Sequence, residues 1–326
     1  EEKGEKGVAR AAASQQGEAH SEFIQPLAPL DIDTLPFEQL LRFWQHPVRA
    51  FFQQRLRVNF RSEESEIPED EPFVLEGLSR YQLNQQLLNT LIEQQDASAM
   101  YRRFRAAGEL PFGAFGELAW EAQRQEMQNL AERVIASRQP AQSMEIDLQC
   151  NGINLTGWLQ QVQPDGLLRW RPSLLSVSQG VQLWLEHLVY CASGGLGESR
   201  LFVRKEGEWR FPPLAAGAGA AYLNELVEGY LQGMSKPLLL LPESGGAWLK
   251  ACYDAEKDVM LMDDDTQQKA RSKFLQAYEG NMVVSGEGAD IWYQRLWRTL
   301  EPAYYEEIIA QAQRYLLPIF RFHQSE

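Results

Sequence analysis

Apolar residues recur at helical spacing in the first part of the chain, after an opening stretch without any such pattern. Residues 1–30 are dominated by Glu, Lys, Gly, Ala, Ser and Gln, a composition that predicts a flexible linker or leader. Residues 31–140 then have the spacing of a helical region, because side chains three and four positions apart share one helix face. The expected helices run through Phe37–Trp44, Val48–Val58, Tyr81–Leu91, Met100–Ala107 and Gly113–Ser137, with an acidic, proline-bounded loop at Ser62–Pro72.

Two of these helices carry further signals. The first is expected to have Asp33 or Thr34 as its cap and to meet Pro47, a residue that tends to interrupt a helix. The last is long and amphipathic. Its apolar face is predicted to comprise Phe115, Leu118, Ala119, Met127, Leu130 and Val134.

The spacing of apolar residues changes after Pro140 from the helical period to the alternation typical of a strand. Met144, Ile146 and Leu148 alternate with polar residues, as expected for a strand with one buried face. Asn151-Gly152 and Pro164-Asp165-Gly166 are turn signals, so the pattern predicts a three-stranded meander that ends near Arg171.

The rest of the chain mixes helices with short strands. The expected elements are a helix at 178–192, a hairpin at 200–211, a helix at 214–234, a buried strand at 238–241, and helices at 244–254, 266–278 and 289–314, the last interrupted at Pro302. This order predicts an α/β protein with a mixed β-sheet flanked by helices. Residues 31–140 would form its helical part, 141–260 its α/β core and 261–326 a set of C-terminal helices.

Composition narrows the classes of function. The formal net charge is −14, which disfavours a general phosphate-binding surface and favours a protein partner. Three cysteines without a CxxC pair, and only four histidines, indicate neither a disulfide framework nor a zinc site. We therefore expect a reducing compartment, such as the bacterial cytoplasm, and no metal or other cofactor in this chain.

Two further features of the sequence concern the length of its apolar runs and its first residue. Its apolar runs are much shorter than the roughly 18 residues that a membrane-spanning helix needs, so no membrane association is expected. The sequence begins with Glu1 rather than Met, which suggests a fragment or a processed product.

Four segments, in order, resemble the RecB-family nuclease fold of the PD-(D/E)xK superfamily, which is restriction-endonuclease-like. Leu40–Phe52 is similar to the family's helix ending in Cys-Pro, with His46 at the Cys position. Gly113–Glu121 resembles its Gly-Thr-x-x-His-x-x-x-Glu helix, with Glu117 where the His would sit. Gly157–Gln160 and Arg169–Arg171 resemble Gly-x-Ile-Asp and Asp-x-Lys, and Gln179–Tyr190 lies in the place of its Gln-x-x-x-Tyr helix.

The run from Phe37 to His323 also resembles the C-terminal region of the RecC family, the non-catalytic subunits of RecBCD helicase–nucleases (exodeoxyribonuclease V). That resemblance implies RecB-type and RecD-type subunits as partners, with ATP and Mg²⁺ used by those subunits. It further implies contact with double-stranded DNA ends or forks during double-strand-break repair and recombination. The expected role is a scaffold that holds the complex together and guides DNA.

The matched positions predict that nuclease chemistry is lost. A nuclease of this kind needs clustered carboxylates that hold Mg²⁺, together with a lysine. Here Gln160 is neutral, Arg169 is a fixed cation where an anion is required, and Arg171 stays protonated. Glu117 and Glu121 are too few to rebuild the site. The same residues would also be ordinary on a strand that never belonged to a nuclease, so inactivity follows under either interpretation.

Two alternatives remain open from the sequence. An active Mg²⁺-dependent nuclease could use Asp263-Asp264-Asp265, although these residues precede a helix, where acids are common caps. A free-standing DNA-binding module would need basic surfaces, against which the acidic charge argues.

Two basic clusters are candidates for contact with nucleic acid. Arg102, Arg103 and Arg105 are interleaved with Tyr101 and Phe104, a pattern suited to phosphate contact and base stacking. The second cluster flanks the predicted hairpin turn, where a protruding tip could wedge a DNA fork. It comprises Arg204, Lys205, Arg210 and Trp209. A solvated helix turn and a solvated hairpin tip are the competing interpretations.

Overall fold

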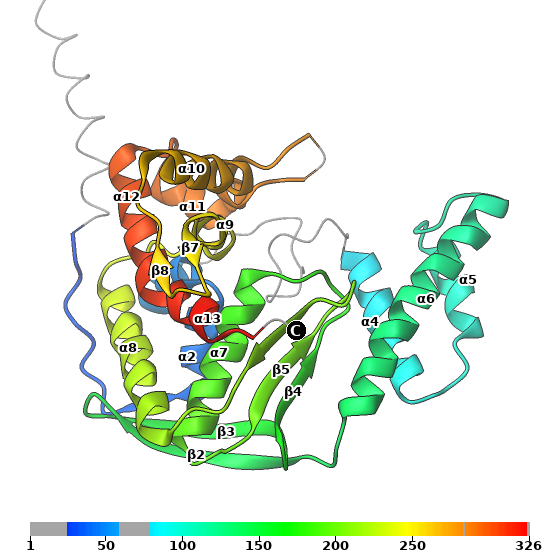
Figure 1. Ribbon diagram of the computed structural model, residues 1–326, viewed down its shortest axis with the longest axis horizontal. Coiled ribbons are helices and arrows are strands. Elements are labelled where there is room, and N and C mark those ends of the chain that lie inside the picture. The colour runs from blue at the N-terminus through cyan, green and yellow to red at the C-terminus, as the bar shows by residue number, and fades with distance from the viewer. Residues whose placement is uncertain (1–24, 59–77, 283, 325–326) are drawn as a thin grey trace, which may run out of the picture.

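The computed structural model describes residues 25–58, 78–282 and 284–324. Within them, a six-stranded mixed sheet lies at the centre, with helices on both sides (Figure 1). β3 is the longest strand and pairs antiparallel with β2 and β4 and parallel with β1. β5 lies parallel to β4, and β6 forms the edge of the sheet in a hairpin with β5. The strands are β1 (Thr34–Pro36), β2 (Gln142–Cys150), β3 (Ile153–Gln163), β4 (Gly166–Trp170), β5 (Glu198–Phe202) and β6 (Glu208–Phe211).

The meander and the hairpin are confirmed where the sequence predicted them. Asn151 and Gly152 both have positive φ, at 51° and 79°, which is the backbone that a tight two-residue hairpin requires. Gly166 has a φ of 135° and no room for a side chain, since a Cβ there would lie 1.7 Å from the carbonyl oxygen of Glu198. The Asn151-Gly152 turn therefore sets the register of β2 with β3, and Gly166 permits the close pairing of β4 with β5.

One face of the sheet is covered by helices from both ends of the chain. α7 (Val177–Ala192) lies centrally on this face, beside α2 (Phe37–Gln45) and α8 (Ala216–Ser235) (Figure 1). Ser176 and Gln179 form a capping box at the start of α7. The remaining elements complete this side: α3 (Pro47–Ala50), η2 (Phe51–Arg55), α9 (Pro242–Cys252), β7 (Tyr253–Asp254), β8 (Val259–Met260), α10 (Asp264–Glu279), η3 (Glu287–Ala289), α11 (Ile291–Leu296), α12 (Pro302–Gln311), η4 (Ala312–Leu316) and α13 (Leu317–Phe322).

The other face carries a helical unit with a core of its own, formed by α4 (Leu78–Ile92), α5 (Ser98–Ala106) and α6 (Ala114–Ser137). This core extends onto the sheet through Leu168 and Phe202. The guanidinium of Arg133 on α6 lies 4.4 Å from the centre of the Phe202 ring and donates to the carbonyl oxygen of Val203. The region 78–137 is thus joined to the sheet mainly along β4 and β5.

The structure differs from the predicted pattern at three places. Thr34–Pro36 pairs with β3 and forms a strand, so Pro36 rather than Asp33 or Thr34 immediately precedes α2. Residues 238–241 are buried but pair with no strand of the described chain; instead the Tyr293 hydroxyl donates to the carbonyl oxygen of Leu240. The predicted helix 289–314 is broken into η3, α11, α12 and η4.

Only the second half of the apolar face predicted for α6 is buried. Met127, Leu130 and Val134 are buried, as predicted. Phe115 and Leu118 are 76% and 68% exposed, because the first half of α6 extends beyond the sheet (Figure 1). The predicted loop at 62–72 and most of the predicted linker lie outside the described residues.

A buried carboxyl joins two helix starts on the first face. Glu287 is 1% exposed and accepts hydrogen bonds from the backbone N–H groups of Glu243 and Ser244, at 3.2 and 2.6 Å, at the first turn of α9. Glu243 in turn accepts from the N–H groups of Val177 and Ser178, at the first turn of α7. Burial raises the pKa of Glu287 to about 8. The two carboxyl groups satisfy helix N–H groups that would otherwise lack acceptors.

Replacing Glu287 with alanine is expected to lower the free energy of unfolding by about 1–3 kcal/mol, because two buried N–H groups lose their acceptor. Urea unfolding of the purified chain, followed by circular dichroism, measures this change. Glu256→Ala is the matched control, since Glu256 is exposed and should stay within about 0.5 kcal/mol of the parent. Equal stability of the two variants would contradict the capping role.

Candidate functional site

The three residues at the matched nuclease positions line two adjoining cavities. One cavity, of about 560 Å³, is lined by Gln160, Arg169 and Arg171 together with residues of the helical unit. A second cavity, of about 200 Å³, shares Arg169, Arg171 and Glu186 with the first and continues toward α2 and the start of α7. We call the two cavities together the central groove.

A bulge in β3 shapes this groove. Between the pairs Gln142–Val162 and Met144–Leu159, one residue of β2 lies opposite Gln160 and Gln161 of β3. Gln161 adopts a φ of 54°, as expected where an extra residue is inserted into a strand. The carbonyl oxygens of Gln160 and Gln161 both accept from Arg169, at 2.9 and 3.2 Å, so the bulge is part of the arginine's binding site.

Arg169 is held on its other side by a carboxylate. Its Nε and Nη2 lie 3.0 and 3.3 Å from the two carboxylate oxygens of Glu186 on α7, a bidentate ion pair with both side chains about four-fifths buried. The Gln160 side chain accepts from the Ser143 hydroxyl at 2.5 Å. The groove therefore holds a fixed guanidinium, already neutralised by the one carboxylate among its lining residues.

Amide side chains are the commonest polar groups in the central groove. They come from α2, α4, α7, β3 and the segment before β2: Gln45, Gln85, Asn89, Gln139, Gln160, Gln161, Gln163, Gln179 and Gln182. Such side chains both donate and accept hydrogen bonds and carry no charge. The arrangement is suited to binding a polar ligand and offers no carboxylate pair to a divalent cation.

Glu117 is not brought to this groove. It is exposed on the first turn of α6 and lines neither cavity. Glu121 forms an ion pair with Arg124 at 2.6 Å, and that hydrogen bond lowers the pKa of its carboxyl. The two glutamates thus lie on the projecting part of the helical unit, away from Gln160, Arg169 and Arg171.

The arginines of the cluster on α5 are exposed, but one of its two aromatic residues, Phe104, is not available for stacking. Arg102, Arg103 and Arg105 lie on the surface; Arg103 donates to Gln86 at 2.9 Å, and Arg105 lies over the Tyr101 ring. Phe104 is fully buried, 5.4 Å from Trp120 between ring centres. The expected interleaving of arginines with base-stacking rings is therefore wrong for Phe104, because that ring belongs to the core of the helical unit.

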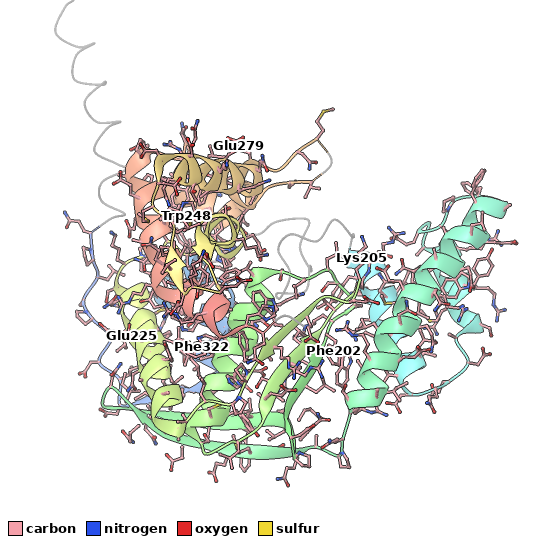
Figure 2. All side chains as sticks on the ribbon, viewed as in Figure 1. Phe202, Lys205, Glu225, Trp248, Glu279 and Phe322 are labelled. Atoms are coloured by element: carbon pink, nitrogen blue, oxygen red, sulfur yellow. The ribbon has the colours of Figure 1, made fainter. Side chains whose placement is uncertain are left out.

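The β5–β6 hairpin does not present an aromatic wedge. Trp209 is 2% exposed, and its indole N–H donates to the carbonyl oxygen of Ser176 at 2.8 Å. Arg204 forms an ion pair with Glu126 of α6 at 2.8 Å, and Arg210 pairs with Glu198. Lys205 lies at the tip of the hairpin, near the helical unit (Figure 2). The wedge hypothesis is wrong for Trp209, because residues two apart on a strand share a face and Phe211 is buried too.

The acidic run at 263–265 begins α10. The Asp263 side chain accepts from the Thr266 N–H at 3.0 Å, which makes it the helix cap. Within the described residues, no group of three or more His, Cys, Asp or Glu side chains is placed to hold a metal ion. No described helix is both long and apolar enough to cross a bilayer.

Sequence reasoning missed Glu186, although a signal was present. Gln182 and Glu186 lie four residues apart on the face of α7 that lines the groove, within a helix whose other side chains are mostly apolar. A polar pair at that spacing on a buried helix indicates a lined cavity rather than a core.

These features define a mixed α/β domain with a docked helical unit and an arginine- and amide-lined groove at the end of β3 and β4. The chain belongs to the RecC C-terminal domain family, whose family model matches residues 32–253. It is 73% identical to the RecBCD enzyme subunit RecC of Escherichia coli strain K12 over 314 residues, 96% of this chain and 28% of that protein.

More distant relatives carry the same description. The RecBCD enzyme subunit RecC of Buchnera aphidicola subsp. Acyrthosiphon pisum is 31% identical over 284 residues, 87% of this chain and 26% of that protein. That of Mycolicibacterium smegmatis is 25% identical over 308 residues, 90% of this chain and 28% of that protein. The chain therefore spans between a quarter and three tenths of the length of these relatives.

Proposed function

We propose that this chain is a catalytically inactive, nuclease-like scaffold domain of a RecBCD-type complex. In this role it holds helicase and nuclease subunits together and guides DNA during double-strand-break repair and recombination. Membership of the RecC C-terminal domain family supports the complex, since the relatives are described as RecBCD enzyme subunits.

One observation supports the loss of catalysis: the guanidinium of Arg169 is held in place by Glu186 and by two backbone carbonyl oxygens. A nuclease of the PD-(D/E)xK type needs carboxylates around Mg²⁺ at this point between the third and fourth strands. Arg169 instead lies between Glu186 and two backbone carbonyl oxygens, where its charge repels a cation. Glu186 is committed to that ion pair and would have to release it before it could bind a metal.

The nuclease-like ancestry rests on where the matched segments lie. Gln160 and the Arg169–Arg171 segment come from β3 and from the end of β4, and they meet α7 at one groove, as the segments of an active site would. The alternative, an active Mg²⁺-dependent nuclease with a non-standard acidic site, gains no support from Asp263, Asp264 and Asp265. Asp263 caps α10, and its two neighbours form the first turn of that helix.

Capture experiments test the scaffold role. The full chain, carrying an affinity tag, is mixed with purified RecB-type and RecD-type subunits, and the bound fraction is analysed by gel electrophoresis. We expect stoichiometric retention of at least one subunit, with the tag alone as control. Failure to retain either subunit, while the chain is folded by circular dichroism, would refute the scaffold role.

A further inference from the structure

β2 is an edge strand of the sheet and follows the lower border of the view in Figure 1. Among the described residues, no backbone hydrogen bond joins it to any segment other than β3. Its nine residues include neither proline nor lysine, which commonly prevent an edge from accepting another strand. The bulge disturbs only its first residues, between Gln142 and Met144. The outer backbone groups of residues 144–150 are therefore placed to hydrogen-bond with one more strand.

The exposed face of β2 carries two carboxylates. Glu145 and Asp147 are two residues apart on the strand and therefore lie on the same face. Within residues 25–58, 78–282 and 284–324, neither side chain has an ion pair or a hydrogen bond. Trp158 of β3 lies opposite Glu145 in the register and is 56% exposed. Two carboxylates beside an exposed indole attract Lys and Arg side chains, through charge and through the face of the ring.

The opposite face of β2 leaves apolar surface at the rim of the core. Ile146 and Cys150 are buried there. Met144 and Leu148 share that face but are only partly buried against the core. A strand added beside β2 would cover them with apolar side chains of its own. Because side chains alternate between the two faces, such a strand must carry basic residues at every second position and apolar residues between them.

The charge of the edge also decides against other occupants. If β2 paired antiparallel with β2 of a second copy, Glu145 and Asp147 would face the same residues of that copy, and like charges across a strand pair are destabilising. The whole chain has 45 acidic against 31 basic residues, not counting histidine, which adds to the repulsion between copies. The phosphates of a nucleic acid would be repelled in the same way. The occupant that fits is a basic, extended polypeptide.

We propose that β2 is a docking edge for an extended segment of a partner polypeptide in which basic and apolar residues alternate. The segment adds to the sheet as a further strand, with its basic side chains at Glu145, Asp147 and Trp158 and its apolar side chains over Met144 and Leu148. This docking edge deepens the proposed function, on which it rests for the source of the segment, another subunit of the complex.

Fluorescence anisotropy with the full chain tests the docking edge. One probe is a labelled peptide in which lysine alternates with valine over the length of β2; a second has glutamate in place of each lysine. The parent chain should bind the lysine peptide and not the glutamate peptide. Glu145→Lys with Asp147→Lys reverses the charge of the edge. We expect this variant to raise the dissociation constant of the lysine peptide about tenfold or more and to bind the glutamate peptide instead.

Glu117→Lys with Glu256→Lys is the matched control. Both residues are exposed and lie outside β2, and the pair changes the net charge by the same amount. The dissociation constant of the lysine peptide should change less than about twofold. Equal weakening by the two double variants, undetectable binding by the parent, or equal binding of the lysine and glutamate peptides would each overturn the proposal.

Backbone pairing distinguishes strand addition from simple charge attraction. Two further lysine peptides are N-methylated at alternate residues, one at the lysines and the other at the valines, so that each lacks the N–H donors along one edge. One of them should bind at least about tenfold more weakly than the other, because only one edge faces β2. Hydrogen exchange should also slow in the fragment that contains Gln142–Cys150 when the unmethylated peptide binds. Equal affinity of the two methylated peptides, or protection confined to other fragments, contradicts strand addition.

The charge-reversed variant separates the docking edge from the scaffold role. Loss of lysine-peptide binding by Glu145→Lys with Asp147→Lys, together with weaker capture of at least one partner subunit, supports both statements. Loss of peptide binding with unchanged capture of both subunits refutes the docking edge alone. Specific peptide binding by a parent chain that captures neither subunit refutes the scaffold role alone.

Discussion

Trp209→Ala is expected to lower the free energy of unfolding by about 3–5 kcal/mol, the range for truncation of a large buried aromatic side chain. The indole is 2% exposed and packs 5.7 Å from Phe320 and 4.7 Å from His323 between ring centres. It also lies so close to α7 that a Cβ at Gly180 would come within 2.6 Å of it. Its removal opens a cavity between the β5–β6 hairpin, α7 and the C-terminal helix α13.

Trp158→Ala is the matched control, because Trp158 is 56% exposed on β3. Urea unfolding of both variants should show a loss of less than about 1 kcal/mol for Trp158→Ala. A DNA wedge at Trp209 would give the opposite pattern, with normal stability and impaired fork unwinding. Comparable stability losses in the two variants would contradict the burial of Trp209.

Acidification is expected to destabilise the chain through His187, by about 3 kcal/mol between pH 6.5 and pH 4. The ring is fully buried and bridges the Ser199 hydroxyl, at 2.7 Å, and the carbonyl oxygen of Pro212, at 2.9 Å. Since that carbonyl can only accept, Nε2 carries the proton and Nδ1 accepts from Ser199. Burial lowers the pKa of His187 to about 4.

The direction of this pH effect follows from the pKa of His187 in the unfolded and in the folded chain. In the unfolded chain the imidazole has its ordinary pKa near 6.5, so it takes up a proton at a pH where the folded ring is still neutral. Stability is therefore full above pH 6.5 and is lost as the pH falls toward 4.

Urea unfolding at a series of pH values measures this effect. His187→Gln cannot titrate but can still donate and accept, and it should show a pH dependence flatter by about 3 kcal/mol over the same interval. Parallel curves for parent and variant would disprove the assignment.

Much of the sheet could be predicted from the sequence because its signals are local. The Asn151-Gly152 turn and the alternation from Met144 onward define β2 and β3, and Ser176 with Gln179 marks the start of α7. β1 could not be found this way, since three residues show no alternation and their pairing with β3 is contributed by a distant segment. The run 238–241 has the composition of a buried strand, but burial among helices satisfies the same apolar side chains.

The residues of the candidate site also differ in whether the sequence could predict them. Gln160, Arg169 and Arg171 could be named through family resemblance, and the structure places them at one groove. Glu117 lies elsewhere, because its helix projects from the sheet. The spacing of Gln182 and Glu186 marks both as residues that line a cavity, but the bidentate bond of Glu186 to Arg169 could not be predicted, since it depends on how α7 crosses β4.

Mg²⁺-dependent DNA cleavage by the purified chain, assayed with end-labelled single-stranded and double-stranded DNA, decides whether the nuclease chemistry is lost. The clamped Arg169 and the lack of a carboxylate pair in the groove predict no cleavage above the buffer blank. Cleavage that requires Mg²⁺ and disappears on replacing Asp263, Asp264 and Asp265 with alanine would contradict the account.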